Sequence, residues 1–149
     1  MQEDISMRIG RPSTPLLVAG LLVSITVMTT AYAELPPGSY EKLKASAQEK
    51  LKVKIVAVEE KAQSDRRLDV QFTAEVLKVE RSKSGLRPGD KIQIRSYHWT
   101  KGYLGPKNPP LLPVGWVGIA YLNKEDGNAK DTGTIYSIAA YGDSFEENR

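Results

Sequence analysis

Aromatic, cationic and imidazole side chains are concentrated in one short segment of the chain, residues 95–103. The segment holds the only histidine, one of the two tryptophans, two tyrosines and two cations. Aromatic faces beside cations and a titratable ring suit the binding of a sugar, a peptide or an anionic group, because they combine apolar area with oriented donors. The candidate ligand-binding residues are Arg95, Tyr97, His98, Trp99, Lys101 and Tyr103.

The same segment also has a purely structural explanation, which the sequence leaves open. Aromatic residues at the end of a strand are normally part of the core. In that case Trp99 and one tyrosine close the end of a barrel, and His98 is a surface ring. The proline-rich stretch 106–113 follows and would form a rigid rim beside the segment.

The sequence contains no recognisable catalytic constellation. It has no Gly-x-Ser-x-Gly elbow, and spacing identifies no serine or aspartate partner for His98. Adjacent carboxylates such as Glu59 and Glu60 lie in polar segments, where water would solvate both groups. We therefore expect no catalytic residues and no enzyme activity.

Composition excludes several kinds of metal and cofactor site. The chain has 149 residues, no cysteine and one histidine. Disulfides, iron–sulfur clusters, thiolate zinc sites and multi-histidine metal cages are thereby ruled out. Residues 123–131 offer several oxygen ligands, but they lack the spacing of an EF-hand and include two lysines. We expect no metal and no cofactor.

The charge pattern bears on nucleic-acid binding. The net charge is +3, from 21 basic and 18 acidic residues. Cations and anions alternate along residues 42–60 and 78–91, and they form no stripe of one sign. We therefore expect another extracytoplasmic protein as the partner, and not a nucleic acid.

Residues 1–33 have the pattern of an export signal. Arg8 and Arg11 precede an apolar run at 16–28, and the small-x-small sequence 31–33 follows it. The run is shorter than the roughly 20 residues of a membrane-spanning helix. We expect cleavage after Ala33, with an uncleaved anchor as the alternative. An exported chain without cysteine indicates a bacterial periplasmic or secreted protein, with no stable membrane span after cleavage.

The mature part is predicted to contain one short helix and five strands. Residues 40–50 carry apolar side chains at three- and four-residue steps after Ser39, a potential N-cap, and predict a short helix or an ordered coil. From Leu51 the apolar period becomes two, with Ala57 among the inward residues. The predicted strands are 51–58, 68–78, 91–96, 115–122 and 134–140.

The connections between the strands also carry signals. At Leu77 the apolar parity shifts by one, which predicts a β-bulge near Val76 and Leu77. Four prolines and two glycines within 100–114 exclude a helix and an interior strand, and predict a long ordered loop. Residues 59–67 and 123–133 are predicted to be polar connections.

Five strands separated by loops, with glycines inside them, predict a mainly β fold. We expect a small five-stranded antiparallel OB-like barrel with a short N-terminal helix, preceded by a signal peptide. The predicted organisation is 1–33 for the signal peptide, 34–50 for the entry segment and helix, and 51–149 for the barrel domain.

The order of these segments resembles the netrin/TIMP-like module. The segments that carry the resemblance are 51–58, 72–81, 89–94, 110–115, 119–122 and 140–145. The resemblance implies a five-stranded OB-type barrel with flanking helices, in a family of metalloproteinase inhibitors and protein-binding modules. The family's inhibitors chelate the protease zinc through an N-terminal cysteine. This chain has no cysteine, so that activity is not carried over.

The function expected from these patterns is an exported, non-catalytic binding module. Protein–protein interaction in the periplasm or outside the cell would use loops at one barrel end, including residues 97–103 and 106–113. The alternatives are an inhibitor or an enzyme of cell-envelope chemistry, or a purely structural domain, because a fold alone does not choose among them.

Overall fold

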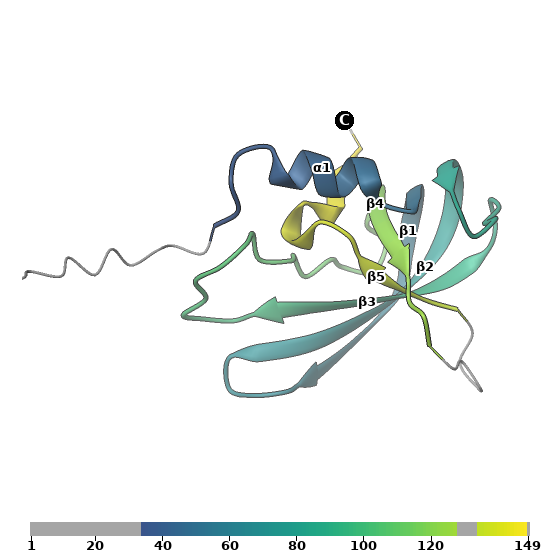
Figure 1. Cartoon of the computed structure of the whole chain (residues 1–149). Coiled ribbons are helices and arrows are strands. Elements are labelled where there is room, and N and C mark those ends of the chain that lie inside the picture. The colour runs from purple at the N-terminus through teal and green to yellow at the C-terminus, as the bar shows by residue number, and fades with distance from the viewer. Residues whose placement is uncertain (1–33, 128–133, 149) are drawn as a thin grey trace, which may run out of the picture. The chain divides into compact units, whose positions relative to one another are not determined.

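Strands with alternating apolar and polar residues build a closed barrel (Figure 1). The computed structural model describes residues 34–127 and 134–148, so the predicted export signal lies outside the described residues. The described residues all belong to one compact unit. The barrel strands are β1 (Glu49–Ala62), β2 (Arg67–Ser82), β3 (Lys91–Trp99), β4 (Val117–Lys124) and β5 (Ile135–Ile138).

The strand order closes the sheet on itself. The order β1-β2-β3-β5-β4 continues with a pairing of β4 to β1, so that the expected five-stranded barrel is confirmed. The pair β3–β5 is parallel, and the expectation of a wholly antiparallel barrel is wrong at this pair. The physical reason is the path of the chain. After β3 the chain runs back as β4, and β5 then pairs antiparallel with β4, so that β5 points the same way as β3.

The core fills the barrel with the inward residues of every strand. Phe72, Ile94 and Leu122 are fully buried, as is nearly all of Tyr136. The alternation of period two in these segments predicts one inward face for β2 and for β3, and these faces are buried: Val70, Phe72, Ala74 and Val76 in β2, and Ile92, Ile94 and Ser96 in β3. Removal of this apolar surface from water supplies the main driving force for closing the sheet.

Three register shifts interrupt the ladder of β1 and β2, and two of them bear on the predicted side-chain directions. Lys52 pairs with Lys78 but Val53 pairs with Val76, so Leu77 is unpaired, and the predicted bulge is confirmed. Another register shift lies between Ile55 and Ala57. It reverses the alternation of β1, since an extra residue moves the following side chains to the other face. Ala57 is therefore exposed, and its predicted inward position is wrong.

The hairpin of β1 and β2 is longer than predicted. Its ladder continues from Ala57 with Thr73 to Ala62 with Leu68, so the predicted connection 59–67 is wrong and only residues 63–66 link the strands. Polar residues occupy this part of β1 because both of its faces are open to solvent there. The predicted strand starts at 115 and 134 and the end at 140 also differ from the bounds of β4 and β5.

The N-terminal helix, α1 (Ser39–Ser46), is shorter than predicted. Its N-cap is Gly38, with φ of 80° and no side-chain cap, so the assignment of Ser39 as the N-cap is wrong. The helix stops because Glu49 already pairs with Ser82 on β2 and with Leu122 on β4. Hydrogen bonding to two neighbouring strands stabilises the extended backbone at Glu49 more than a further turn of so short a helix would stabilise the helical one. Among the described residues, no helix has the length and apolarity needed to cross a membrane.

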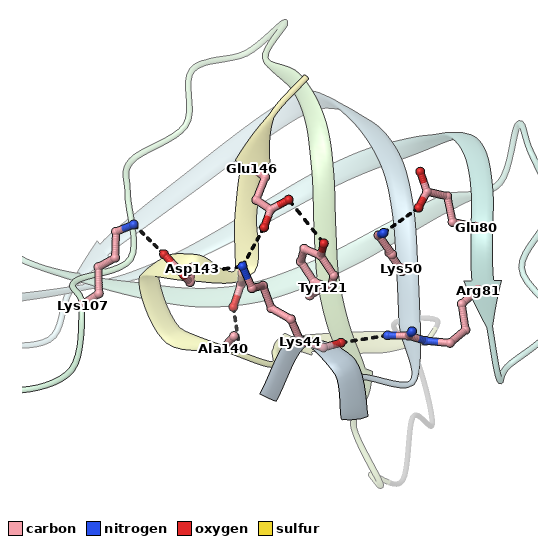
Figure 2. Close-up of polar contacts among 10 residues, drawn as sticks. Lys44, Lys50, Glu80, Arg81, Lys107, Tyr121, Ala140, Asp143 and Glu146 are labelled. Atoms are coloured by element: carbon pink, nitrogen blue, oxygen red, sulfur yellow. Dashed lines mark hydrogen bonds and ion pairs between the residues drawn. The ribbon is translucent and has the colours of Figure 1, made fainter. Parts of the chain in front are cut away.

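The chain ends with two elements that were not predicted, the 3₁₀ helix η1 (Tyr141–Ser144) and the strand β6 (Phe145–Glu147). Phe145 packs edge-on against Phe72 and Trp116, with ring centroids 5.8 and 5.9 Å apart. In Figure 1, η1 (yellow) lies beside α1. Figure 2 shows how Lys44 of α1 reaches Asp143 and Glu146, and thereby ties the helix to the end of the chain.

Candidate binding groove

The three-stranded sheet β1–β2–β3 projects beyond the closed part of the barrel. β1 pairs with β4 only as far as Lys54, and β3 pairs with β5 only as far as Arg95, whereas β2 pairs with both to the ends of the strands. In Figure 1 the β1–β2 hairpin and the end of β3 extend together to the left of the barrel. In residues 34–127 and 134–148, no strand covers the outer edges of these ends.

A groove of about 1000 Å³ lies on this projecting sheet. It is lined by residues 59–61 of β1, 69–71 of β2 and 95–97 of β3, and closed by Glu125 and Ser137. The volume is in the range of ligand-binding clefts. We take this groove as the candidate functional site.

The charges in the groove nearly balance. Four carboxylates, Glu59, Glu60, Asp69 and Glu125, line it with three cations, Lys61, Arg67 and Arg95. Arg95 Nη1 lies 3.0 Å from Glu125 Oε2, and Arg67 Nε lies 3.4 Å from Asp69 Oδ1. A mixed lining of this kind complements a ligand that carries both signs, and offers little to a polyanion.

Tyr97 forms the aromatic part of the groove. Burial raises the pKa of Tyr97 to about 12, with smaller contributions from Tyr103 and Tyr141, so its hydroxyl group stays protonated and can donate at neutral pH. The carbon at the centre of the Arg67 guanidinium lies 4.8 Å from the centroid of the Tyr97 ring. This cation–π contact holds the ring beside the cation.

Trp99 and Tyr103 lie outside the groove lining and stack beside the Arg67–Tyr97 pair. Their rings are nearly parallel, with centroids 5.3 Å apart, and Arg67 lies 5.7 Å from the Trp99 ring. Arg67 meets Trp99 because the two residues are cross-strand partners on the same face of the sheet. The rings therefore stabilise the wall of the groove by contacting one another.

His98 has a structural contact. Its Nδ1 lies 2.7 Å from the carbonyl oxygen of Pro109. A carbonyl oxygen only accepts, so Nδ1 carries the hydrogen and donates. His98 and the exposed Lys101 are not part of the groove lining. Of the six predicted residues, Arg95 and Tyr97 line the groove, and Trp99 and Tyr103 flank it.

The loop after β3 holds these residues in place. Residues 100–116 contain neither helix nor strand, which confirms the predicted long loop. The Asn108 side chain accepts from the Trp99 backbone N–H at 3.0 Å and donates to the Trp99 carbonyl at 2.8 Å. It thus replaces a strand partner at the end of β3 and fixes the loop beside the groove.

Several lining residues were missed by reasoning from the sequence. The sequence predicts a polar connection at Glu59, Glu60 and Lys61 and another at Glu125, but all four residues line the groove. One signal in the sequence is the alternation that begins at Leu68. A strand that starts there needs a paired neighbour over its full length, which extends the preceding strand into residues 59–61. Among the described residues, no three histidine, aspartate or glutamate side chains are grouped to hold a metal ion.

No family model, no curated protein and no solved structure matches this chain.

Proposed function

We propose that the protein is an exported, non-catalytic binding module that holds an extended segment of a partner protein in the groove. In this proposal the barrel is of the OB type found in netrin/TIMP-like modules, and the protein acts in the periplasm or outside the cell. The observation that carries the proposal is the groove between the open edges of β1 and β3.

Backbone geometry supports an extended polypeptide as the ligand. The outer edges of β1 after Ile55 and of β3 after Arg95 carry N–H and C=O groups that pair with no other strand of the described chain. The Trp99 groups at the end of β3 are the exception, since the Asn108 side chain binds them. An extended peptide can satisfy such groups by adding itself as a strand. Main-chain hydrogen bonds would supply affinity, and side chains in the groove would supply selectivity.

The lining supports a partner segment with both charges. Arg95 can bind a carboxylate of the partner, and Glu59 and Glu60 can bind its cations. Tyr97 offers apolar area and a protonated hydroxyl group. An inhibitor of a cell-envelope enzyme would use the same groove, and the recovered partner would then be that enzyme.

The proposal is tested by affinity capture with groove variants. Immobilised protein is incubated with an envelope extract, and the partner is identified by mass spectrometry. Arg95→Glu places a second carboxylate beside that of Glu125. We expect the amount of recovered partner to fall at least tenfold, which corresponds to about 1.4 kcal/mol of binding free energy. Lys101→Glu is the matched control, since Lys101 is exposed outside the groove.

The thermal midpoint of each variant shows whether it is folded. Equal recovery by the wild type and by folded Arg95→Glu would refute the groove as the binding site. Failure of the wild type to retain any partner would contradict the proposed function itself.

A further inference from the structure

A row of lysines follows the outer face of β1 at the opposite end from the groove. Lys50, Lys52 and Lys54 alternate with buried Leu51 and Val53. Alternate residues of a strand point to the same face, about 6.5–7 Å apart. The sheet therefore carries three cations in line.

The neighbouring strand adds a fourth cation to this face. Lys52 is directly opposite Lys78 of β2. Like charges directly opposite each other destabilise a sheet. In the described ranges, no carboxylate oxygen lies within 4 Å of the ammonium groups of Lys52 or Lys78. Neither ammonium group therefore has a direct ion-pair partner within this part of the chain.

Of the other two lysines in the row, Lys50 forms an ion pair and Lys54 does not. Figure 2 shows the ammonium group of Lys50 directed to Glu80, with Nζ 2.8 Å from Oε2. Lys54 is the cross-strand neighbour of Glu75, but the two form no ion pair by the same distance criterion. Lys52, Lys54 and Lys78 are therefore the cations available to an external anion.

Exposed apolar side chains lie beside these lysines. Leu77, the unpaired residue of the bulge next to Lys78, is 37% exposed. Val117 of β4, which pairs with Lys54, is 36% exposed. Cations flanked by apolar side chains match the boundary between lipid headgroups and acyl chains.

We propose that Lys52, Lys54 and Lys78, with Leu77 and Val117, form a face that docks on a surface of anionic phospholipid. The lysines contact phosphate groups, and the two apolar side chains enter the headgroup region. A nucleic acid would favour the aromatic and arginine side chains near the groove, but these already contact one another. The proposal does not depend on the function of the groove.

The test measures binding of the full chain to vesicles. Vesicles of phosphatidylcholine alone are compared with vesicles that also contain phosphatidylglycerol, at low and at physiological ionic strength. Residues 1–33 are present in every protein compared, so any binding they cause is the same in the wild type and in each variant. The difference between the two lipids isolates the effect of lipid charge.

Two triple variants with the same net charge separate the face from overall charge. The first carries Lys52→Gln, Lys54→Gln and Lys78→Gln. The matched control carries Lys42→Gln, Lys83→Gln and Lys124→Gln, at lysines exposed elsewhere. Each set of changes lowers the net charge from +3 to 0. Each lysine near an anionic surface contributes about fivefold, so the first variant should lose roughly 100-fold of its binding to phosphatidylglycerol vesicles.

The outcomes decide the proposal as follows. Retained binding by the control and lost binding by the first variant, with both proteins folded by circular dichroism, support it. The single variant Lys78→Gln, with an expected loss of about fivefold, serves if the triple variant does not fold. Equal losses in both variants, no preference of the wild type for phosphatidylglycerol, or binding to duplex DNA without binding to vesicles would overturn it.

Discussion

Glu49, the first residue of β1, places a carboxyl group in the protein interior. The residue is fully buried, and its Oε1 accepts from the Ser84 N–H at 3.0 Å. Its Oε2 has no hydrogen-bond partner among the described residues. A buried carboxylate without a cation costs free energy. We infer that Glu49 lowers the stability of the fold.

Glu49→Gln should therefore raise the free energy of unfolding by about 1 kcal/mol at neutral pH. Glutamine keeps the oxygen that accepts from Ser84 and removes the charge. Urea denaturation at neutral pH measures the gain, with exposed Glu60→Gln as the control. A less stable Glu49→Gln variant would show that the charge itself is needed.

At the scale of elements, β3 depends on the loop that follows it. Only β2 accompanies the end of β3 as a strand, and the side chain of Asn108 serves as its neighbour on the other edge. His98 adds a second link through Pro109. The position of Trp99 is thus set by two loop residues that lie about ten positions further along the chain.

Asn108→Ala should lower the free energy of unfolding by about 2 kcal/mol, because two hydrogen bonds to the Trp99 backbone are lost. We also expect tryptophan fluorescence to change, as Trp99 loses its fixed place against Tyr103. Asn108→Asp keeps the acceptor for the Trp99 N–H and should cost about half as much. Equal stability of the alanine variant and the wild type would refute the bridging role.

The existence of the strands was predictable, and their ends were not. Alternation located the inward residues of β2 and β3, and a parity shift located the bulge at Leu77. The bulge that exposes Ala57 was invisible, because Val56, Ala57 and Val58 are all apolar and fit either face. The end of α1 was set by the pairing of Glu49 with two distant strands, which local sequence does not encode.

The part of the candidate site that could be predicted from the sequence is the part contributed by the single segment 95–103. Arg95 and Tyr97 stood out by composition and do line the groove. Glu60 lines it because the hairpin pairs Glu60 with Val70. The proximity of these two residues depends on the register of the two strands, which no short sequence motif reveals. His98 stood out by being unique, but its contact with Pro109 is structural.

At the scale of the whole molecule, a polar network joins the helix to the end of the chain. Lys44 Nζ lies 2.7 Å from Glu146 Oε1 and 3.6 Å from Asp143 Oδ2, and Lys107 also pairs with Asp143 (Figure 2). The hydrogen bond to Glu146 raises the pKa of Lys44 above its ordinary value of 10.5, against the effect of burial. Burial raises the pKa of Asp143, but Lys107 and Lys44 lower it below its ordinary value of 3.8.

These shifts predict how stability depends on pH. The raised pKa of Lys44 stabilises the fold below pH 10.5, and this contribution is lost as the pH rises through the folded-state value. The lowered pKa of Asp143 stabilises the fold above pH 3.8, and this contribution is lost as the pH falls through the folded-state value. The network should therefore contribute fully between these two limits.

Lys44→Met should remove the alkaline loss and lower the free energy of unfolding at pH 7 by about 1 kcal/mol. Lys42→Met, at an exposed position on the same helix, should leave both unchanged. Urea denaturation from acid to alkaline pH measures the two effects. An alkaline loss of the same size in Lys44→Met would assign it to another group.

The pairing of β1 with β4 also governs when the barrel can form. Leu51 pairs with Ala120, so the partner of the first strand lies far downstream in the chain. While a ribosome is still producing β4, the nascent polypeptide has β2 as a neighbour for β1 but nothing for its other edge. Contacts between such distant segments form late and slowly. The barrel of the emerging chain thus remains open until β4 has been synthesised.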